Sequence, residues 1–206
     1  MADADSQSAV VIGIIGPPGS GKSAVMGAFE ECGAEVLSLD AIGHELLADA
    51  DVKALIQDAF GDGVFEPDGA VSRTKLGARV FADPAELARL NAIVHPRLVA
   101  EAKKRIAAWR ERTGEGRRGL VIEGALLVEF GLDETCDHVV LVAAPFDVRL
   151  QRVAEGRGWT REELERRERA QLSDGQRRAR SDTVIDNVST LNDVRTTVMG
   201  LWKEWT

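Results

Sequence analysis

The chain has 206 residues, and its 34 acidic against 26 basic side chains give a formal net charge of −8 at pH 7. Its length and its 44% content of hydrophobic residues are ordinary for one globular domain with a sizeable core. The acidic balance argues against a large nucleic-acid footprint, because phosphate backbones are bound by basic surfaces.

The remaining composition points to a cytoplasmic protein. No apolar run approaches the length of a membrane span. Residues 1–8 are polar and acidic, unlike a secretory signal, and we expect them to be disordered. Two cysteines, Cys32 and Cys136, are too few for a disulfide framework and are expected to be buried or half-buried thiols. We therefore expect neither nucleic acid nor membrane among the partners.

The first strong motif is a glycine-rich turn between a predicted strand and a predicted helix. The apolar run 10–15 leads into Gly16-Pro17-Pro18-Gly19-Ser20-Gly21-Lys22-Ser23, which fits the pattern G-x-x-x-x-G-K-[ST]. Glycines let successive backbone N–H groups face inward, and the following helix presents its positive end to the same point. A plain glycine turn would need neither the lysine nor the hydroxyl at this spacing. The motif therefore indicates a site for nucleotide phosphates.

Each part of this loop has an expected role. In such loops the lysine reaches the β- and γ-phosphates and the hydroxyl ligates Mg²⁺. These roles fall on Lys22 and Ser23. The residues expected to bind the nucleotide here are Gly16, Pro18, Gly19, Ser20, Gly21, Lys22, Ser23 and Ala24.

A second candidate is Asp40, at the end of a short predicted strand, Glu35–Asp40. Ligands of parallel α/β sheets bind beyond the carboxyl ends of the strands, which would place this carboxylate near the phosphate loop. Asp40 could also cap a helix that begins at Ala41, and the two interpretations are compatible. The helical stretch that follows runs to Phe60 and is stopped by Gly61-Asp62-Gly63.

The next part of the chain is predicted to be helical. A short helix begins at Ser72–Leu76, and Asp83-Pro84-Ala85-Glu86 is typical of another helix start. That second helix contains His95-Pro96, where the proline should kink or break it. Residues 46–113 therefore look like a helical insertion between two strands, and Thr113–Arg117 looks like an exposed polar loop.

Regular sheet then returns. Gly119–Gly124 and His138–Ala143 are continuously apolar, which fits parallel strands covered on both faces, and Thr183–Asn187 is a fifth short strand. Residues 125–132 are a connection without a clear helix, and a helix over Leu191–Trp205 closes the chain. Glu123, at a strand end, could hold a water on Mg²⁺ as a Walker-B acid does. It could equally pair with a neighbouring Lys or Arg.

Residues 146–175 form a charged, helical and arginine-rich segment, in which Thr160-Arg161-Glu162-Glu163 is typical of a capping box. The usual meaning of such a run is a solvated face with Glu–Arg pairs. A phosphotransferase, however, needs cations that close over the transferring group, and a mobile helical hairpin could carry them. We expect one or two of these arginines to act in this way.

Taken together, these segments resemble the dephospho-coenzyme A kinases, over nearly the whole chain. The phosphate loop alone is common to many kinases and ATPases. Six more specific signals stand in the family's order: Asp40 with residues 41–47; Phe60-Gly61 with residues 68–73; Val80-Phe81 with Leu90–Pro96; residues 126–129; the spacing from Arg167 to Gln171; and residues 181–187.

The resemblance implies an α/β protein with the three-layer P-loop kinase fold, a five-stranded parallel sheet, a helical substrate-binding insertion and a helical lid. The nucleotide-binding core would comprise residues 1–45, 114–148 and 178–206, the coenzyme-binding insertion residues 46–113, and the lid residues 149–177. The family transfers the γ-phosphoryl group of ATP to the ribose 3′-hydroxyl of dephospho-coenzyme A, the last step of coenzyme A synthesis. ATP, Mg²⁺ and dephospho-coenzyme A are thus the expected ligands of a monomer or weak oligomer.

The resemblance also assigns roles to single residues. Asp40 matches the carboxylate that receives the proton of the 3′-hydroxyl, and Lys22 and Arg157 would act with it in catalysis. Asn187 lies where the family's chain passes the adenine of ATP. The other implied positions are Arg73, His95 and Glu129 for the substrate, Arg152, Arg157 and Arg167 in the lid, and Ser23 and Glu123 for the metal.

Some positions depart from the family's pattern. The usual Thr-Gly-Gly-Ile-Gly reads Ile15-Gly16-Pro17-Pro18-Gly19, and the lid's Arg-Asp-Gly reads Gly156-Arg157-Gly158. The lid arginine would therefore be Arg157 after a local shift, or Arg152. The other replacements are Ser38 for an aspartate, His44 for an arginine and Glu123 for an aspartate.

Two other functions are compatible with the phosphate loop. One is a different small-molecule P-loop kinase, with a nucleotide or a sugar acid as acceptor; the segments around Arg73 and His95 count against it. The other is a nucleotide-binding regulator without turnover. A guanine-nucleotide switch would carry Asn-Lys-x-Asp for base recognition, and the sequence contains no such motif.

Overall fold

The computed structural model of the chain describes residues 9–112 and 119–206. The expectations of a disordered segment at residues 1–8 and of an exposed loop at Thr113–Arg117 concern residues outside these ranges. Among the described residues, no helix is long and apolar enough to cross a membrane. The chain divides into two compact units: the described residues up to Ser38 and from Ile106 onward form one, and Leu39–Arg105 forms the other.

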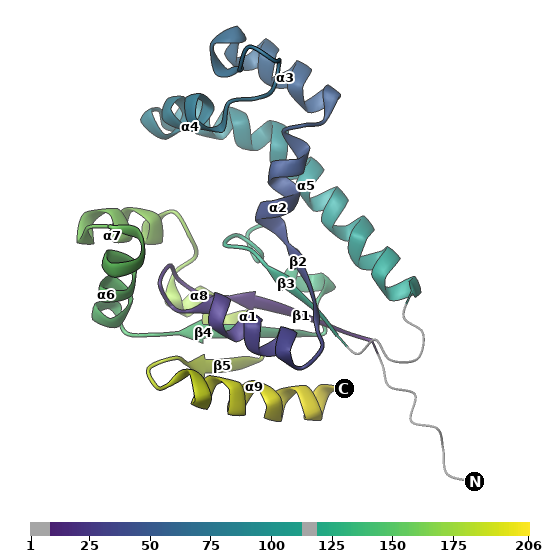
Figure 1. Cartoon of the computed structure of the whole chain (residues 1–206), viewed down its shortest axis with the longest axis vertical. Helices are drawn as coiled ribbons and strands as arrows, with labels where there is room; N and C mark the ends of the chain where they lie inside the picture. The colour runs from purple at the N-terminus through teal and green to yellow at the C-terminus, as the bar shows by residue number, and fades with distance from the viewer. Residues whose placement is uncertain (1–8, 113–118) are drawn as a thin grey trace. The chain divides into compact units, whose positions relative to one another are not determined.

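The first unit is built on a five-stranded sheet in which every neighbouring pair of strands is parallel (Figure 1). The strands are β1 (Val10–Ile15), β2 (Glu35–Ser38), β3 (Gly119–Glu123), β4 (His138–Ala143) and β5 (Thr183–Asp186). Their order across the sheet is β2-β3-β1-β4-β5. The predicted α/β fold with a five-stranded parallel sheet is therefore confirmed.

Helices cover the central strands, which explains why the strand sequences are continuously apolar. All six residues of β1 are buried. One face carries α1 (Lys22–Glu31) and α9 (Leu191–Trp205), which share a core with the strands. In that core Phe29 of α1 lies against Trp202 of α9, with ring centroids 6.2 Å apart. This packing fixes α1, whose first turn completes the phosphate loop.

The strand order places the candidate site at one edge of this sheet. β1 lies between β3 and β4. After β1, the chain adds β2 and β3 on one side of it and then β4 and β5 on the other side. Parallel α/β sheets bind ligands at such a switch point, beyond the carboxyl ends of the strands. Gly16 follows β1, Glu123 ends β3 and Asn187 follows β5. Three predicted site segments thus reach the same edge.

Three arginine-rich helices lie between β4 and β5: α6 (Phe146–Arg157), α7 (Arg161–Arg169) and α8 (Asp174–Ala179). Thr160 caps α7, and its hydroxyl accepts a hydrogen bond from the Glu163 amide at 3.3 Å. The reciprocal half of the predicted capping box is missing among the described contacts. The Glu163 carboxylate instead accepts hydrogen bonds of 2.6 Å from Arg166 and from Arg167, because two guanidinium groups outcompete one backbone amide for a carboxylate.

The second unit is helical, as predicted for this part of the chain. Its helices are α2 (Leu39–Leu46), α3 (Ala50–Phe60), α4 (Arg73–Ala82) and the part of α5 (Pro84–Arg112) up to Arg105. A small core holds them together, and its fully packed members are Val52, Ile56, Phe60, Val64, Leu76 and Val80. Ser72 caps α4, and this helix begins where the sequence predicts a short helix at Ser72–Leu76.

Two helix boundaries differ from the prediction. β2 ends at Ser38 and α2 begins at Leu39, so Asp40 lies in the first turn of a helix and not at a strand end or helix cap. The stretch expected as one helix up to Phe60 is two helices, α2 and α3. The interruption arises because the Asp49 side chain accepts hydrogen bonds from two amides of the following turn and so starts a new helix.

Of the two outcomes expected at Pro96, a kink or a break in its helix, the break does not occur. α5 runs through it for 29 residues. A proline removes one helical N–H and disturbs the carbonyls of the preceding turn, but here the Arg97 guanidinium donates a 2.8 Å hydrogen bond to the Ile93 carbonyl. Ile93 packs on the helical core before the proline, and Leu98 is buried after it. Side-chain packing on both halves therefore outweighs the missing bond.

Both cysteines are free and half-buried, as predicted. The sulfur of Cys136 lies 2.9 Å from the point that a Cβ on Gly13 would occupy, so the thiol fills space that this glycine leaves against β1. Burial raises the pKa of the Cys136 thiol to about 12. A thiol that stays protonated is a poor nucleophile and metal ligand, which agrees with a packing role.

Candidate active site

The phosphate loop adopts a backbone that only glycine accommodates well. Gly19 has a φ of 77° and Gly21 a φ of 94°, both in the left-handed region. A Cβ on Gly21 would lie 2.0 Å from Nδ2 of Asn187. Gly21 is also the N-cap of α1, and no side chain of residues 9–112 or 119–206 caps that helix. No side-chain acceptor among the described residues therefore competes with an anion for this helix end, as expected for a phosphate loop.

Cationic and amide side chains hold the carbonyls of this loop. Lys22 Nζ donates to the Gly16 carbonyl at 2.8 Å and to the Pro17 carbonyl at 3.3 Å. The Ser20 carbonyl accepts from Asn187 Nδ2 at 2.8 Å and from Arg152 at 3.3 Å. In a trans peptide the N–H points away from the C=O. Fixing the Ser20 carbonyl therefore directs the Gly21 N–H to the opposite side of its peptide plane, whereas the Gly16 and Pro17 carbonyls precede prolines, which have no N–H.

Asn187 is a structural part of this loop, a role that sequence reasoning missed. It is buried, its backbone amide donates to Ala143 at 2.7 Å, and its carbonyl accepts from Arg152 at 3.0 Å. It thereby joins the end of β5 to the phosphate loop 167 residues earlier in the chain. Its expected place beside the adenine stays a prediction.

We predict that Gly21→Ala destabilises the protein. The substitution forces a side chain into a left-handed conformation, which costs about 1–2 kcal/mol. It also displaces Asn187, and the lost hydrogen bond costs about another 1 kcal/mol. We expect urea denaturation to show a decrease of about 2–3 kcal/mol in the free energy of unfolding.

Gly27→Ala, in the same helix, is the matched control. A Cβ at Gly27 meets no atom within 4 Å, and its φ lies outside the left-handed region. Replacing a helical glycine with alanine should raise the free energy of unfolding by about 0.5–1 kcal/mol. Equal effects of the two substitutions would contradict the strained geometry that the structure gives to Gly21.

Two oxygen ligands suited to Mg²⁺ belong to this edge of the sheet. The hydroxyl of Ser23 is exposed in the first turn of α1, and the half-buried Glu123 ends β3, paired in register with Ile14 of β1. No group of three or more His, Cys, Asp or Glu side chains among the described residues could hold a metal by itself. Mg²⁺ normally takes one or two protein oxygens together with substrate phosphates and water. The residues present fit such a site.

Two of the predicted lid arginines meet at one aromatic ring. The guanidinium carbon of Arg157 lies 5.0 Å from the centre of the Trp159 ring, and that of Arg167 lies 4.2 Å from it. Arg167 also pairs with Glu163 at 2.6 Å. Arg157 is exposed and has no ion-pair partner among the described residues. Arg152, in contrast, is half-buried and donates hydrogen bonds to the carbonyls of Ser20 and Asn187.

Glu129 has a structural partner in the same unit. Its carboxylate accepts a 3.0 Å hydrogen bond from the Leu172 amide, in the turn between α7 and α8. It also lies close enough to influence the guanidinium of Arg177, whose pKa burial lowers. The structure thus links Glu129 to the base of the arginine-rich helices. Its expected contact with the substrate stays a prediction.

The second unit carries the other three predicted residues. Asp40 is exposed in the first turn of α2, and its carboxylate forms no hydrogen bond or ion pair with a described residue. Arg73 is exposed at the first position of α4. His95 is half-buried in α5, where burial lowers the pKa of its imidazole. All three lie on helices of one unit, and their expected roles stay predictions.

Comparison with known proteins agrees with this fold. The family model described as dephospho-CoA kinase matches residues 10–193. A dephospho-CoA kinase of Thermobifida fusca is 39% identical over 94% of this chain and 94% of its own length. The crystal structure of TT1252 from Thermus thermophilus superimposes with a TM-score of 0.77 at 31% identity, covering 97% of this chain and 99% of that one. A dephospho-CoA kinase from Campylobacter jejuni shares the fold, with a TM-score of 0.71 at 18% identity over 95% of this chain and 96% of its own.

The family match therefore includes the phosphate loop, the whole helical unit and the arginine-rich helices. It removes the ambiguity that the phosphate loop leaves when taken alone, because that loop occurs in many kinases and ATPases. The chain belongs to the dephospho-CoA kinase family.

Proposed function

We propose that this chain transfers the γ-phosphoryl group of ATP to the ribose 3′-hydroxyl of dephospho-coenzyme A. The observation that supports this most is the family match over residues 10–193, because it extends beyond the phosphate loop to the helical unit. The loop explains how ATP is held. Its inward N–H groups and the first turn of α1 receive the phosphates, while Lys22 neutralises their charge.

Asp40 is the proposed base for the acceptor. In the transfer, the 3′-oxygen forms a bond to the γ-phosphorus, the bond from this phosphorus to the bridging β,γ-oxygen breaks, and ADP leaves. The proton of the 3′-hydroxyl passes to the Asp40 carboxylate. No described cation pairs with this carboxylate, so it can accept a hydrogen bond from the substrate without first losing another partner.

Ser23 and Glu123 are the proposed protein contacts of Mg²⁺, the first directly and the second through water. A bound Mg²⁺ would neutralise charge on the β- and γ-phosphates. Glu123 would hold a water molecule on the metal, as a Walker-B acid does. The hydroxyl of Ser23 and the N–H groups of the same helical turn would then face the same phosphates.

Arg157 is the proposed lid arginine for the transferring group. Arg152 already donates to two backbone carbonyls of the loop region, and Arg167 is paired with Glu163. Arg157 is exposed and stacked only on Trp159 among the described residues, so its guanidinium can turn to a phosphate without breaking an ion pair. Arg73, His95 and Glu129 are the proposed substrate contacts.

A coupled assay for ADP release with several acceptors tests this function. We expect turnover with dephospho-coenzyme A and Mg·ATP, and little with nucleoside monophosphates, shikimate or gluconate. Turnover with one of the latter but not with dephospho-coenzyme A would identify a different small-molecule kinase. ATP binding without turnover on any acceptor would favour a regulator. A cytoplasmic location and a monomer or weak oligomer stay predictions of the sequence.

A further inference from the structure

We propose that Arg149 is a positioning residue that connects the phosphate loop to helix α7 through Glu168, so that ATP binding and the position of α7 are energetically coupled. This inference rests on the proposed function only in that the loop binds ATP. Arg149 is in the first half of α6, and nothing in the sequence pattern separates it from the other arginines of its segment.

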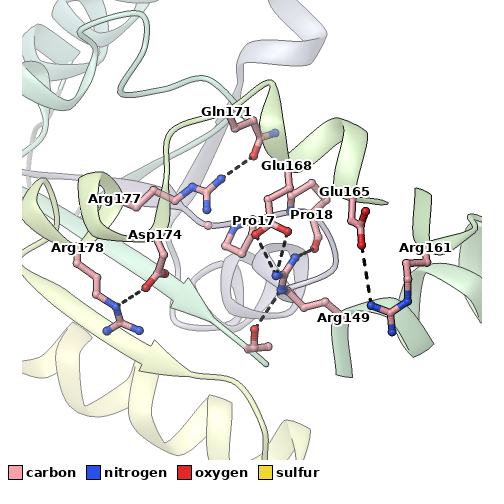
Figure 2. Close-up of polar contacts among 12 residues, drawn as sticks. Pro17, Pro18, Arg149, Arg161, Glu165, Glu168, Gln171, Asp174, Arg177 and Arg178 are labelled. Atoms are coloured by element: carbon pink, nitrogen blue, oxygen red, sulfur yellow. Dashed lines mark hydrogen bonds and ion pairs between the residues drawn. The ribbon is translucent and has the colours of Figure 1, made fainter. Parts of the chain in front are cut away.

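Several arginines of residues 146–175 form ion pairs, and among these the side chain of Arg149 is the most buried. Its side chain is 6% exposed, and its guanidinium group reaches three different elements (Figure 2). Nε donates to the Ala144 carbonyl at 3.0 Å, and one terminal nitrogen donates to the Pro18 carbonyl at 3.3 Å. The other terminal nitrogen donates to both Glu168 oxygens, at 3.0 and 3.2 Å.

The hydrogen bond to the Pro18 carbonyl sets the direction of the Gly19 N–H group in the loop. Pro18 and Gly19 share one peptide plane, in which the C=O and the N–H point in opposite directions. By holding the Pro18 carbonyl, Arg149 directs the Gly19 N–H away from itself. Proline has no N–H, so residues 17 and 18 give the loop no donors, and the first donor after them is the Gly19 amide. Its direction therefore matters for the phosphate.

The loop and α6 are also in direct contact at this point. A Cβ on Gly19 would lie 2.8 Å from the Arg149 carbonyl and 2.9 Å from Cγ1 of Val153. Gly19 therefore packs against the α6 backbone, and a shift of Arg149 cannot be absorbed by empty space. Interiors packed in this way transmit displacements.

Glu168 makes Arg149 depend on α7. A buried guanidinium charge is costly unless an anion pairs with it. Glu168, 30% exposed in the last turn of α7, supplies that anion through a two-oxygen contact with one guanidinium nitrogen. If α7 moves, Arg149 must lose this partner or follow it, and the Pro18 carbonyl is released or displaced. By reciprocity, a phosphate that holds the loop also favours the α7 position seen here.

Lysine cannot reproduce this arrangement. Three acceptors around a planar group require the fork of arginine, whereas an ammonium is a compact point charge. Arg149→Lys thus keeps the charge and loses the geometry. Glu168→Gln keeps the shape of its side chain and loses the charge. Glu168→Gln therefore weakens only the bond to α7, whereas Arg149→Lys disturbs the bonds to both the loop and α7.

The test is isothermal titration with Mg·ATP in the absence of acceptor, on the full chain. We expect Kd for ATP to rise about tenfold in Arg149→Lys and about fivefold in Glu168→Gln, at the lower end of typical coupling between sites. Glu165→Gln is the matched control, because Glu165 is on the same helix and its nearest cations, Arg161 and Arg169, lie 4.0 and 3.7 Å away. Its Kd should match the wild type within about twofold, as for exposed ion pairs generally.

Two further readouts separate positioning from a general loss of stability. The double variant Arg149→Lys/Glu168→Gln should have the same Kd for ATP as Arg149→Lys alone. Both substitutions interrupt the same connection, from the loop through Arg149 and Glu168 to α7, so their effects should not add. In hydrogen exchange, ATP should slow the amides of α7 in the wild type and leave them unaffected in Glu168→Gln. KM for the acceptor should stay unchanged in both single variants.

Several results would overturn the inference. One is a Glu168→Gln protein whose Kd for ATP equals that of Glu165→Gln, even if its melting temperature is lower. Another is a wild type whose α7 exchange is indifferent to ATP. If Arg149→Lys does not fold, Glu168→Gln alone decides the question. Normal ATP coupling without phosphorylation of dephospho-coenzyme A would refute the proposed function and leave this inference standing.

Discussion

Replacing Asp40 with asparagine is expected to lower kcat by about 10²–10⁴-fold, the usual contribution of a general base, with little change in Kd for ATP. Asparagine has nearly the same shape but cannot take up the proton of the 3′-hydroxyl. The loop residues that hold ATP are unchanged, and Asp40 forms no hydrogen bond or ion pair with a described residue whose loss would disturb the helix. Titration with ATP and steady-state kinetics with dephospho-coenzyme A measure the two effects separately.

Asp51→Asn is the control for this substitution. Asp51 is likewise exposed, in the first turn of a helix of the same unit, α3. Its replacement removes the same charge from the same kind of position, so any general effect of that charge on the helical unit appears in both variants. We expect its kcat to equal that of the wild type. Full activity in purified Asp40→Asn would refute the assignment of the base.

The sequence predicts the sheet well because its signals are local. Strands covered on both faces must be apolar throughout, and β1, β3 and β4 can be recognised from this alone. The phosphate loop is equally local, since its glycines, lysine and serine are close together in the chain. The family match then confirms the resemblance that the more distant segments indicate.

The errors have physical causes beyond the reach of local patterns. Pro96 should break a helix by propensity, but the packing of Ile93 and Leu98 and the Arg97 hydrogen bond keep α5 continuous. The sequence places Asp40 at a strand end because the apolar segment before it continues to Leu39. In the structure Leu39 is buried as the first residue of a helix, and burial alone does not distinguish the two conformations.

The roles of single arginines could not be predicted for a similar reason. Arg149, Arg152 and Arg157 have similar surroundings in the sequence. Only the fold brings Arg149 to Pro18, 131 residues away, and Arg152 to Ser20, 132 residues away. The tertiary contacts therefore decide that Arg149 and Arg152 hold carbonyls of the phosphate loop, whereas Arg157 stays exposed.

Lys22→Met is the second substitution with a large expected effect. It should raise Kd for ATP about tenfold or more and lower kcat about 10²–10³-fold, the loss typical of removing one preorganised electrostatic contact from a transition state. The Lys22 ammonium already lies on the Gly16 and Pro17 carbonyls, at 2.8 and 3.3 Å, so its charge is held at the loop before ATP arrives. Methionine keeps most of the length and the apolar stem of lysine, and it removes only the charge and the hydrogen bonds.

Lys103→Met, at an exposed position of α5, is the control and should leave both constants unchanged. ATP affinity within twofold of the wild type in Lys22→Met would show that the phosphates are not bound at this loop. Asp40→Asn and Lys22→Met also differ from each other in kind. Asp40→Asn should change kcat alone, whereas Lys22→Met should change both ATP binding and kcat, since Lys22 acts on phosphates in the ground state and in the transition state. If both variants lost ATP binding equally, a shared structural defect would explain them better than separate roles in phosphate binding and acceptor activation.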